Sequence, residues 1–218
     1  MHDLPSPSPK RSIVSCIAGA FLFRTSAEGT AIILGLYLSY ISDNIQPIPA
    51  FVVGVIGTGY YVVQLVGAPA MGMLSDRWGR KVLMVLGPLL SMLAVLLYPT
   101  TSIVLLIFML LSMEGLAAAM RAPAALSFLS DSTSSSAALR GKTMGIYQLS
   151  LLVSMVLGYV LGGLSWDALE STAFRIVALV YAFGIAVVFF GIEERHRLDH
   201  QPASSLRQSL RSAMRPTV

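Results

Sequence analysis

Long apolar stretches, separated by short polar connections, dominate the chain. A helix that crosses a lipid bilayer needs roughly 20 mostly apolar residues. The chain has six runs of about that length, at residues 13–40, 50–74, 82–99, 103–129, 143–166 and 174–192. These runs leave no room for a soluble catalytic domain. The pattern therefore predicts an all-α membrane protein with six transmembrane helices.

Polar segments flank the apolar region on both sides. Residues 1–12 are rich in Pro and Ser, which predicts a short cytoplasmic lead, and residues 13–192 form the predicted transmembrane bundle. Residues 193–218 turn polar and basic, which predicts a cytoplasmic linker. The first apolar run is too long for the apolar region of a signal peptide, so we interpret it as a retained first helix.

Composition agrees with a membrane location. The chain is 55% hydrophobic and only 12% charged, with a mean hydropathy of +0.73, whereas soluble domains carry about a quarter charged residues. Cys16 is the single cysteine, so the chain can form neither an internal disulfide nor a thiolate metal site. We predict no cofactor and no metal.

The net charge of +4 could indicate nucleic-acid binding, but the placement of the basic residues indicates membrane topology. The connections SDNIQPIP, YPTTS and DALEST contain no Lys or Arg. The other side of the predicted bundle holds Lys10, Arg11, Arg77, Arg80, Lys81, Arg140, Lys142, Arg195, Arg197, Arg207, Arg211 and Arg215. Because cytoplasmic loops carry the excess of Lys and Arg, we expect both termini in the cytoplasm. We expect the protein in the plasma (inner) membrane. Its expected partner there is lipid, and we expect no binding of nucleic acid.

The six runs divide into two groups of three. An odd number of helices in each group makes the second group enter the membrane from the opposite side, as in the inverted repeats of secondary transporters. The sequences GMLSD, at the end of the second run, and GGLSWD, at the end of the fifth, show weak internal similarity. In the fifth run Gly158 and Gly162 form a GxxxG pair, followed by Gly163, and we expect these glycines to allow close helix packing.

Charged residues lie inside two of the apolar runs. Arg24 and Glu28 fall in the first run, and Glu114 and Arg121 in the fourth. Ionisable groups inside a membrane are costly and are functional candidates by default. Arg24 and Glu114 both lie about eleven residues from the start of their runs, near the midplane at roughly 1.5 Å per residue. We therefore expect them to face each other across a polar cavity, to which Gln64 and Gln148 add hydrogen-bonding groups.

Two interpretations of these charges remain open. They could form buried pairs that fix the register of the helices. Alternatively, a glutamate could take up and release a proton during transport. Glu28 is the first candidate for that role, because Glu114 is expected to have a permanent partner.

The stretch GMLSDRWGRKVLM, residues 72–84, resembles the major facilitator superfamily pattern G-x-L-a-D-r-x-G-r-k-x-x-l. The match falls at Gly72, Leu74, Asp76, Arg77, Gly79, Arg80, Lys81 and, by type, Met84. Its position between the second and third runs is also that of the family motif. The segments EGLAAAMRAPAALSFLSD and RGKTMGIYQ resemble the fourth span, the following loop and the start of the fifth span.

This resemblance implies transport of a small molecule by alternating access between two six-helix halves. The chain then corresponds to an incomplete transporter that consists of the N-terminal half. Its expected partners are therefore a small-molecule substrate and the missing C-terminal six-helix half.

The same resemblance implies proton-coupled efflux of a drug or metabolite, with the proton gradient as the driving force. Two departures weaken a drug-antiporter assignment. Leu111 stands where the family's fourth span often has an arginine, and Tyr159 replaces the proline of the antiporter pattern in the fifth span. Uptake or uniport of a sugar or other metabolite is the alternative, and a non-transporting membrane scaffold or receptor is the alternative from another class.

The resemblance also implies that residues 72–81 act as a latch that locks the outward-facing state. In that role Gly72 would allow close helix packing, Gly79 a tight turn, and Arg80 would bind the carboxylate of Asp131. A basic loop that only sets the membrane topology would explain Arg77, Arg80 and Lys81 but not Asp76.

An intramembrane serine protease is excluded because its histidine is missing: His2, His196 and His200 all lie outside the apolar runs. We expect no enzymatic activity.

Overall fold

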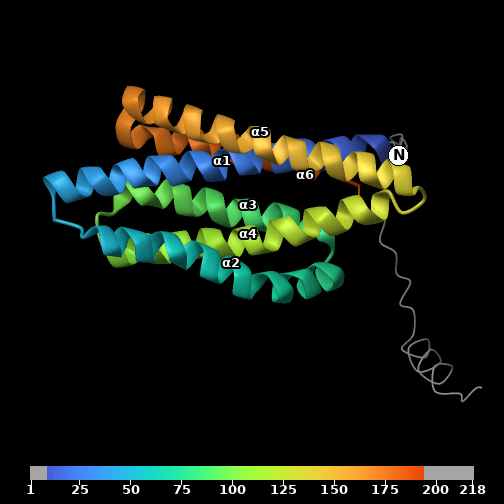
Figure 1. Ribbon diagram of the computed structural model, residues 1–218, viewed down its shortest axis with the longest axis horizontal. Helices are drawn as coiled ribbons and strands as arrows, with labels where there is room; N and C mark the ends of the chain where they lie inside the picture. The colour runs from blue at the N-terminus through green and yellow to red at the C-terminus, as the bar shows by residue number, and fades with distance from the viewer. Residues whose placement is uncertain (1–8, 194–218) are drawn as a thin grey trace, which may run out of the picture.

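The computed structural model describes residues 9–193, and the predicted lead and linker fall largely outside this range. The described residues form six α-helices and two 3-10 turns (Figure 1). The helices are α1 (Pro9–Asn44), α2 (Ala50–Trp78), α3 (Arg80–Leu97), α4 (Val104–Ser132), α5 (Ala137–Leu169) and α6 (Ala173–Gly191). The 3-10 turns are η1 (Tyr98–Thr100) and η2 (Glu170–Thr172). The described part of the chain is therefore all-helical, as the sequence predicts.

Most of the helices extend beyond the apolar runs that predict them. α5 begins at Ala137, before Arg140 and Lys142, although its apolar run begins only at residue 143. Ser136 caps this extension, because its hydroxyl accepts a hydrogen bond of 3.3 Å from the Leu139 backbone N–H. An apolar run marks the part of a helix that suits lipid, whereas capping groups determine where the helix starts.

Five helical stretches are long and apolar enough to cross a membrane. Four of them correspond to α1, α2, α3 with η1, and α4, and the fifth covers residues 137–191, which contain α5, η2 and α6. The chain changes direction at η2, where Glu170 has a positive φ of 47°. The described residues thus have the composition of a multi-pass membrane protein.

The packing of the helices has the symmetry of an inverted repeat. α1 packs against α5 and α6, and α4 packs in the same way against α2 and α3. α3 also packs against α6, near the centre of the bundle. Exchanging α1 with α4, α2 with α5 and α3 with α6 reproduces the same set of neighbours. Two groups of three helices, related in this way, are what the sequence predicts.

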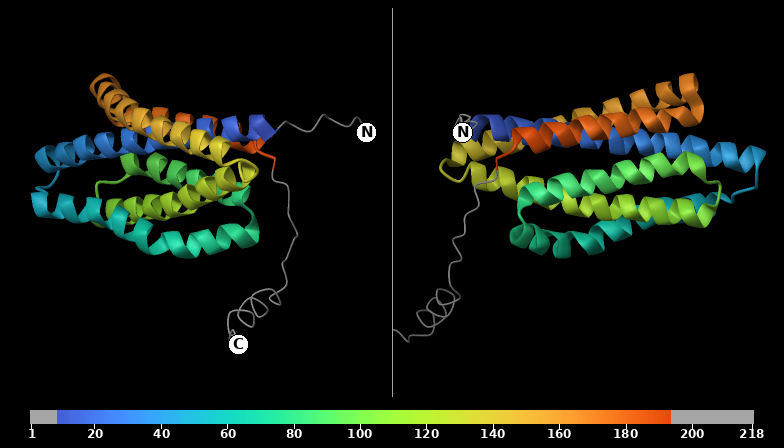
Figure 2. Two further views of the ribbon diagram at one scale, coloured as in Figure 1. Left: turned by 45° about the vertical axis from the view of Figure 1, so that its right-hand side comes forward. Right: turned by 180° about the vertical axis from the view of Figure 1, so that it is seen from behind.

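The start of α1, the α2–α3 turn and the α4–α5 connection lie at one end of the bundle (Figures 1 and 2). We call it the basic end, because these segments contain Lys10, Arg11, Arg77, Arg80, Lys81, Arg140 and Lys142. Arg175 is an exception that the loop sequences do not reveal. It is exposed in the first turn of α6, just beyond the connection DALEST, and therefore lies at the opposite end.

Candidate functional site

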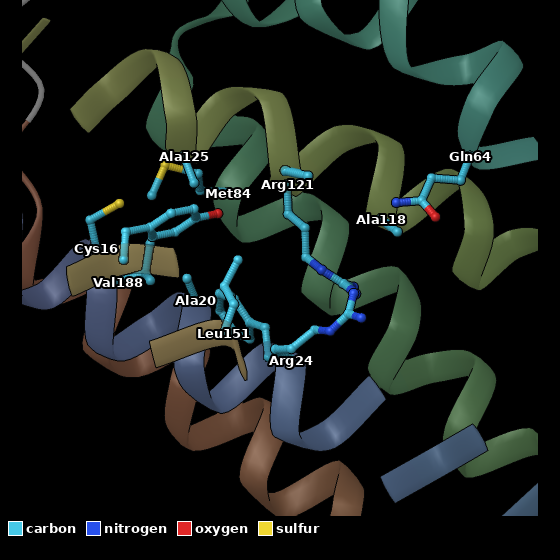
Figure 3. Close-up of a pocket in the computed structure, with 13 residues that line it drawn as sticks. Cys16, Ala20, Arg24, Gln64, Met84, Ala118, Arg121, Ala125, Leu151 and Val188 are labelled. Atoms are coloured by element: carbon cyan, nitrogen blue, oxygen red, sulfur yellow. The ribbon is translucent and has the colours of Figure 1, made fainter. Parts of the chain in front are cut away.

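A small cavity lies inside the bundle, in the half nearer the basic end (Figure 3). All six helices contribute to it, and its volume is about 70 Å³. Arg24, Gln64, Arg121 and Tyr147 supply its polar groups, and the remaining lining is Cys16, Ala20, Phe23, Met84, Ala118, Ala122, Ala125, Leu151 and Val188. The cavity includes Arg24 and Gln64 of the predicted set but not Glu114, and its lining is mostly apolar with a few basic and neutral polar groups.

Arg24 has a different partner from the one expected from its depth in the membrane. Its guanidinium forms an ion pair with Glu28, with 2.6 Å between Nη2 and Oε1. The two residues are one turn apart on α1, which suits a pair on one helix face. The expected pairing of Arg24 with Glu114 is thus replaced by a pairing within one helix, and it is Glu28 rather than Glu114 that has an arginine partner in this structure.

Glu114 lies in the interior of the bundle, with only 3% of its surface exposed. Its neighbours include Tyr60 of α2, Tyr98 of η1 and Arg121 of α4. The hydroxyl of Tyr98 interacts with the Glu114 carboxylate, although neither this hydroxyl nor Oε1 makes a hydrogen bond of ordinary geometry within the described residues. A buried carboxylate oxygen without a well-formed hydrogen bond is costly, so this position requires an explanation beyond packing.

Arg121 lies on the same face of α4 as Glu114, two turns further along. Its guanidinium donates a hydrogen bond of 3.3 Å to the hydroxyl of Ser91 on α3. Tyr60 and Tyr181 also lie near it. No carboxylate among the described residues lies within ion-pair distance of Arg121. The interpretation that buried ion pairs fix the register of the helices therefore fits neither pair: Arg24 and Glu28 pair within one helix, with the Arg24 side chain 40% exposed, and Glu114 and Arg121 form no ion pair with each other.

The two predicted glutamines have different positions. Gln64 of α2 lines the cavity, and Figure 3 shows its side chain among the lining groups. Gln148 of α5 is exposed and is not part of the lining. Its neighbour Tyr147 takes that place, because successive residues of an α-helix point about 100° apart. The expectation for Gln148 is therefore corrected.

A repeated motif, which sequence reasoning missed, relates the two buried glutamates. Residues 26–31 read SAEGTA in α1, and residues 112–117 read SMEGLA in α4. Because α1 and α4 exchange under the inverted repeat, Glu28 and Glu114 occupy equivalent positions. The tyrosines near Glu114 were also missed, because nothing distinguishes them from other aromatic residues in apolar runs.

The glycines after these glutamates are sites of close helix packing. A Cβ atom on Gly158 of α5 would lie 2.6 Å from the carbonyl oxygen of Thr25, and one on Gly162 would lie 2.9 Å from that of Gly29. In the equivalent place, a Cβ atom on Gly115 would overlap the carbonyl oxygen of Tyr60 on α2. Gly158 and Gly162 thus have the predicted packing role. Gly163 has open space around it and does not.

Aromatic side chains fill the half of the bundle away from the basic end. The ring of Tyr37 packs edge-on against Trp166 and Phe174, with centroids 6.2 Å and 5.7 Å away. Tyr98 packs against Phe174 at 5.5 Å. The Tyr37 hydroxyl donates a hydrogen bond of 3.0 Å to the Thr101 carbonyl. This aromatic cluster separates the cavity from the end of the bundle opposite the basic end.

The segment at residues 72–81 forms a tight corner between α2 and α3. Gly79 alone links the two helices, with a φ of 97° that favours glycine. Arg80 donates a hydrogen bond of 2.6 Å to the Ser127 carbonyl and forms an ion pair with Asp131, both on α4. Asp76 lies 3.8 Å from the Arg80 guanidinium. The expected contact between Arg80 and Asp131 is therefore present.

Other residues of the corner have different surroundings. Lys81 lies over the ring of Phe189 on α6, with its Nζ atom 5.1 Å from the ring centroid. Arg77 lies in the last turn of α2, where a cation is favourable. A Cβ atom on Gly72 would meet nothing within 4 Å, so Gly72 faces open space rather than a helix of the described bundle.

In residues 9–193 no three His, Cys, Asp or Glu side chains lie close enough together to hold a metal ion. A packing of two inverted groups of three membrane helices is typical of secondary transporters. A sequence profile of the Major Facilitator Superfamily matches residues 16–217, and the chain belongs to that family. Its members are transporters rather than enzymes.

Two bacterial relatives are proteins named for drug resistance. The chain is 26% identical over 170 residues to multidrug resistance protein 2 of Bacillus subtilis. The aligned region covers 75% of the chain and 42% of the relative. It is 30% identical over 141 residues to the class B tetracycline resistance protein of Escherichia coli. This aligned region covers 65% of the chain and 34% of the relative. The matches thus span less than half the length of either relative.

Proposed function

We propose that this chain is one six-helix unit of a secondary transporter that expels a drug or small metabolite from the cell in exchange for protons. The observation that carries the proposal is the cavity between the two inverted groups of helices, with a buried glutamate on each of the two equivalent helices. The names of the two relatives support drug efflux. The basic end supports cytoplasmic termini and a location in the plasma membrane.

A second six-helix unit would complete the transporter. α2 and α5 present long apolar faces that no other described helix covers: Leu65 of α2 is 76% exposed and Leu149 of α5 is 62% exposed. Lipid would cover part of these faces, and a C-terminal half or a second polypeptide would cover the rest. Gly72, with open space around it, lies on α2 where such a partner could approach closely.

Glu114 is the better proton carrier of the two equivalent glutamates. Glu28 has a guanidinium partner, Arg24, at 2.6 Å. Glu114 is buried and forms no ion pair within the described residues, and a buried carboxyl group is far less costly when it holds a proton. Reorientation of the Arg121 side chain towards Glu114 along α4 would favour release of that proton. This reverses the order of candidates that the sequence alone suggests.

The corner at residues 72–81 would act as the latch between transport states. Arg80 connects the start of α3 to the end of α4 through Asp131 and Ser127. Breaking these contacts would free the basic end of the bundle to open. A local change of charge would then alter the balance between the two global states.

The test uses everted membrane vesicles that contain the protein expressed from its complete reading frame. Tetracycline, the drug named for one relative, is the probe. We expect uptake into vesicles when a proton gradient is present, and loss of uptake when nigericin collapses it. Glu114→Gln is expected to reduce uptake to the level of empty vesicles, whereas Asp167→Asn, a matched change at an exposed position, leaves it unchanged.

Two outcomes would overturn parts of this proposal. Wild-type uptake equal to that of empty vesicles would reject efflux of this drug. Gradient-driven uptake that persists in both Glu28→Gln and Glu114→Gln would reject proton coupling through either glutamate.

A further inference from the structure

We propose that the cavity binds the negatively charged head group of an amphiphilic organic acid, with Arg121 as the main anchor and Arg24 as the second donor. The inference rests on the proposed function for the idea that this cavity receives a transported substrate. The charge of the cavity lining, the hydrogen bonds of the two arginines and the shape of the cavity support it.

The cavity lining contains two cations and no carboxylate. Arg24 and Arg121 both line it, and neither Glu28 nor Glu114 does. Figure 3 shows the two guanidinium groups entering the cavity from α1 and α4. Gln64 and Tyr147 add neutral polar groups that can donate hydrogen bonds to an anion.

The Arg121 guanidinium has more N–H donors than its hydrogen bond to Ser91 uses. A guanidinium has five N–H donors, and the Arg121 side chain donates to the Ser91 hydroxyl. Ion pairs join Arg24 to Glu28 and Arg80 to Asp76 and Asp131, but none is formed by Arg121 in residues 9–193. A guanidinium inside a membrane without a paired anion is costly. An anionic ligand would supply the missing partner.

The size and apolar lining of the cavity limit the rest of the ligand. Its volume of about 70 Å³ is well below the roughly 300–1,000 Å³ of sites that enclose a whole drug-sized ligand. It therefore fits a head group. Phe23, Met84 and Leu151 line it beside the arginines and suit an apolar body. The planar guanidinium fork matches a carboxylate, which it can bind bidentately.

The test is a charge series on the purified wild-type protein in detergent at constant chloride concentration. The probes are benzoate, the neutral benzamide and the cationic benzylamine, which share one ring, with binding measured by calorimetry. We expect benzoate to bind at least about tenfold more tightly than benzamide, a difference of ~1.4 kcal/mol, and benzylamine not to bind. Equal binding of benzoate and benzamide would overturn the proposal.

Variants test Arg121 as the main anchor. Arg121→Gln is expected to weaken benzoate binding at least about tenfold, since a lost hydrogen bond to a charged group costs about 1.5–3 kcal/mol. Arg121→Lys should retain part of the affinity, because it keeps the charge and loses the fork. Arg175→Gln removes the same charge at the exposed end of α6 and should leave binding unchanged. Wild-type affinity in Arg121→Gln would reject Arg121 as the anchor.

Phenyl phosphate separates the two kinds of anionic head group. Binding weaker than that of benzoate supports a carboxylate, and tighter binding overturns that part of the proposal. Because these measurements record binding alone, they can fail while tetracycline uptake succeeds, or succeed while uptake fails. The outcome therefore distinguishes the anion site from the proposed efflux function.

Discussion

Single glycines determine how closely the helices approach at two equivalent places in the bundle. Gly29 of α1 lies against Gly158 and Gly162 of α5, and Gly115 of α4 lies against the backbone of Tyr60 on α2. Each contact is next to one of the repeated glutamates. Close packing of backbones at these points excludes side chains that could otherwise fill the space beside Glu28 and Glu114.

Gly115→Ala should destabilise the protein, because the added Cβ atom overlaps the Tyr60 carbonyl oxygen and α4 must move away from α2. Overpacking of this kind costs about 1–3 kcal/mol. Thermal unfolding in detergent should show a clearly lower midpoint for the variant. Gly163→Ala is the matched control, since a Cβ atom there meets nothing within 4 Å. Equal midpoints for the two variants would contradict the close contact.

Residue types and spacing predict some of these positions and not others. The GxxxG spacing identifies Gly158 and Gly162, but it cannot tell that Gly163 faces open space. Depth along the helix identifies Glu114 as buried, whereas the Arg24 side chain is 40% exposed. The depth of a residue in the membrane does not tell in which direction around the helix axis its side chain points. The prediction from depth alone therefore gives Glu114 instead of Glu28 as the partner of Arg24. The same uncertainty in rotation explains why the cavity is lined by the neighbour of Gln148.

At the scale of helices, the corner between α2 and α3 joins local chain geometry to contacts between distant segments. The positive φ of Gly79 reverses the chain within one residue. That turn places Arg80 beside the end of α4, where the Ser127 carbonyl accepts its hydrogen bond and Asp131 pairs with its charge. The motif in the sequence predicts this corner well, because its glycine and its charges each have a local structural reason.

Breaking the ion pair between Arg80 and Asp131 should affect transport more than stability. The Asp131 side chain is 69% exposed, and exposed ion pairs contribute about 0.2–1 kcal/mol. A double-mutant cycle with Arg80→Gln and Asp131→Asn should therefore give a coupling free energy below about 1 kcal/mol in unfolding experiments. The same variants should slow tetracycline uptake into vesicles. Unchanged uptake in Asp131→Asn would reject the latch, with Asp167→Asn as the control for loss of an exposed carboxylate.

At the scale of the whole molecule, the inverted repeat makes the two halves of the bundle alike in helix packing, and the side chains determine that one half holds the cavity and the other the aromatic cluster. The two groups of helices have similar neighbours but different side chains. Tyr37, Tyr98 and Phe174 close one half, and small side chains such as Ala20 and Ala118 leave space in the other. The sequence predicts the repeat from the number of apolar runs. It does not predict which half is closed, because that depends on contacts among residues far apart in the chain.

The direction of the chain across the membrane can be tested with cysteine labelling. In a Cys16→Ser background, Ser135→Cys places a thiol in the connection at the basic end, and Ser171→Cys places one at the opposite end. Both positions are exposed. If the basic end is cytoplasmic, as the distribution of Lys and Arg indicates, a membrane-impermeant maleimide should label only Ser171→Cys in right-side-out vesicles. Detergent should then make Ser135→Cys reactive as well. Labelling of Ser135→Cys before detergent is added would reverse the orientation and place the cavity, with its two arginines, in the outer half of the membrane.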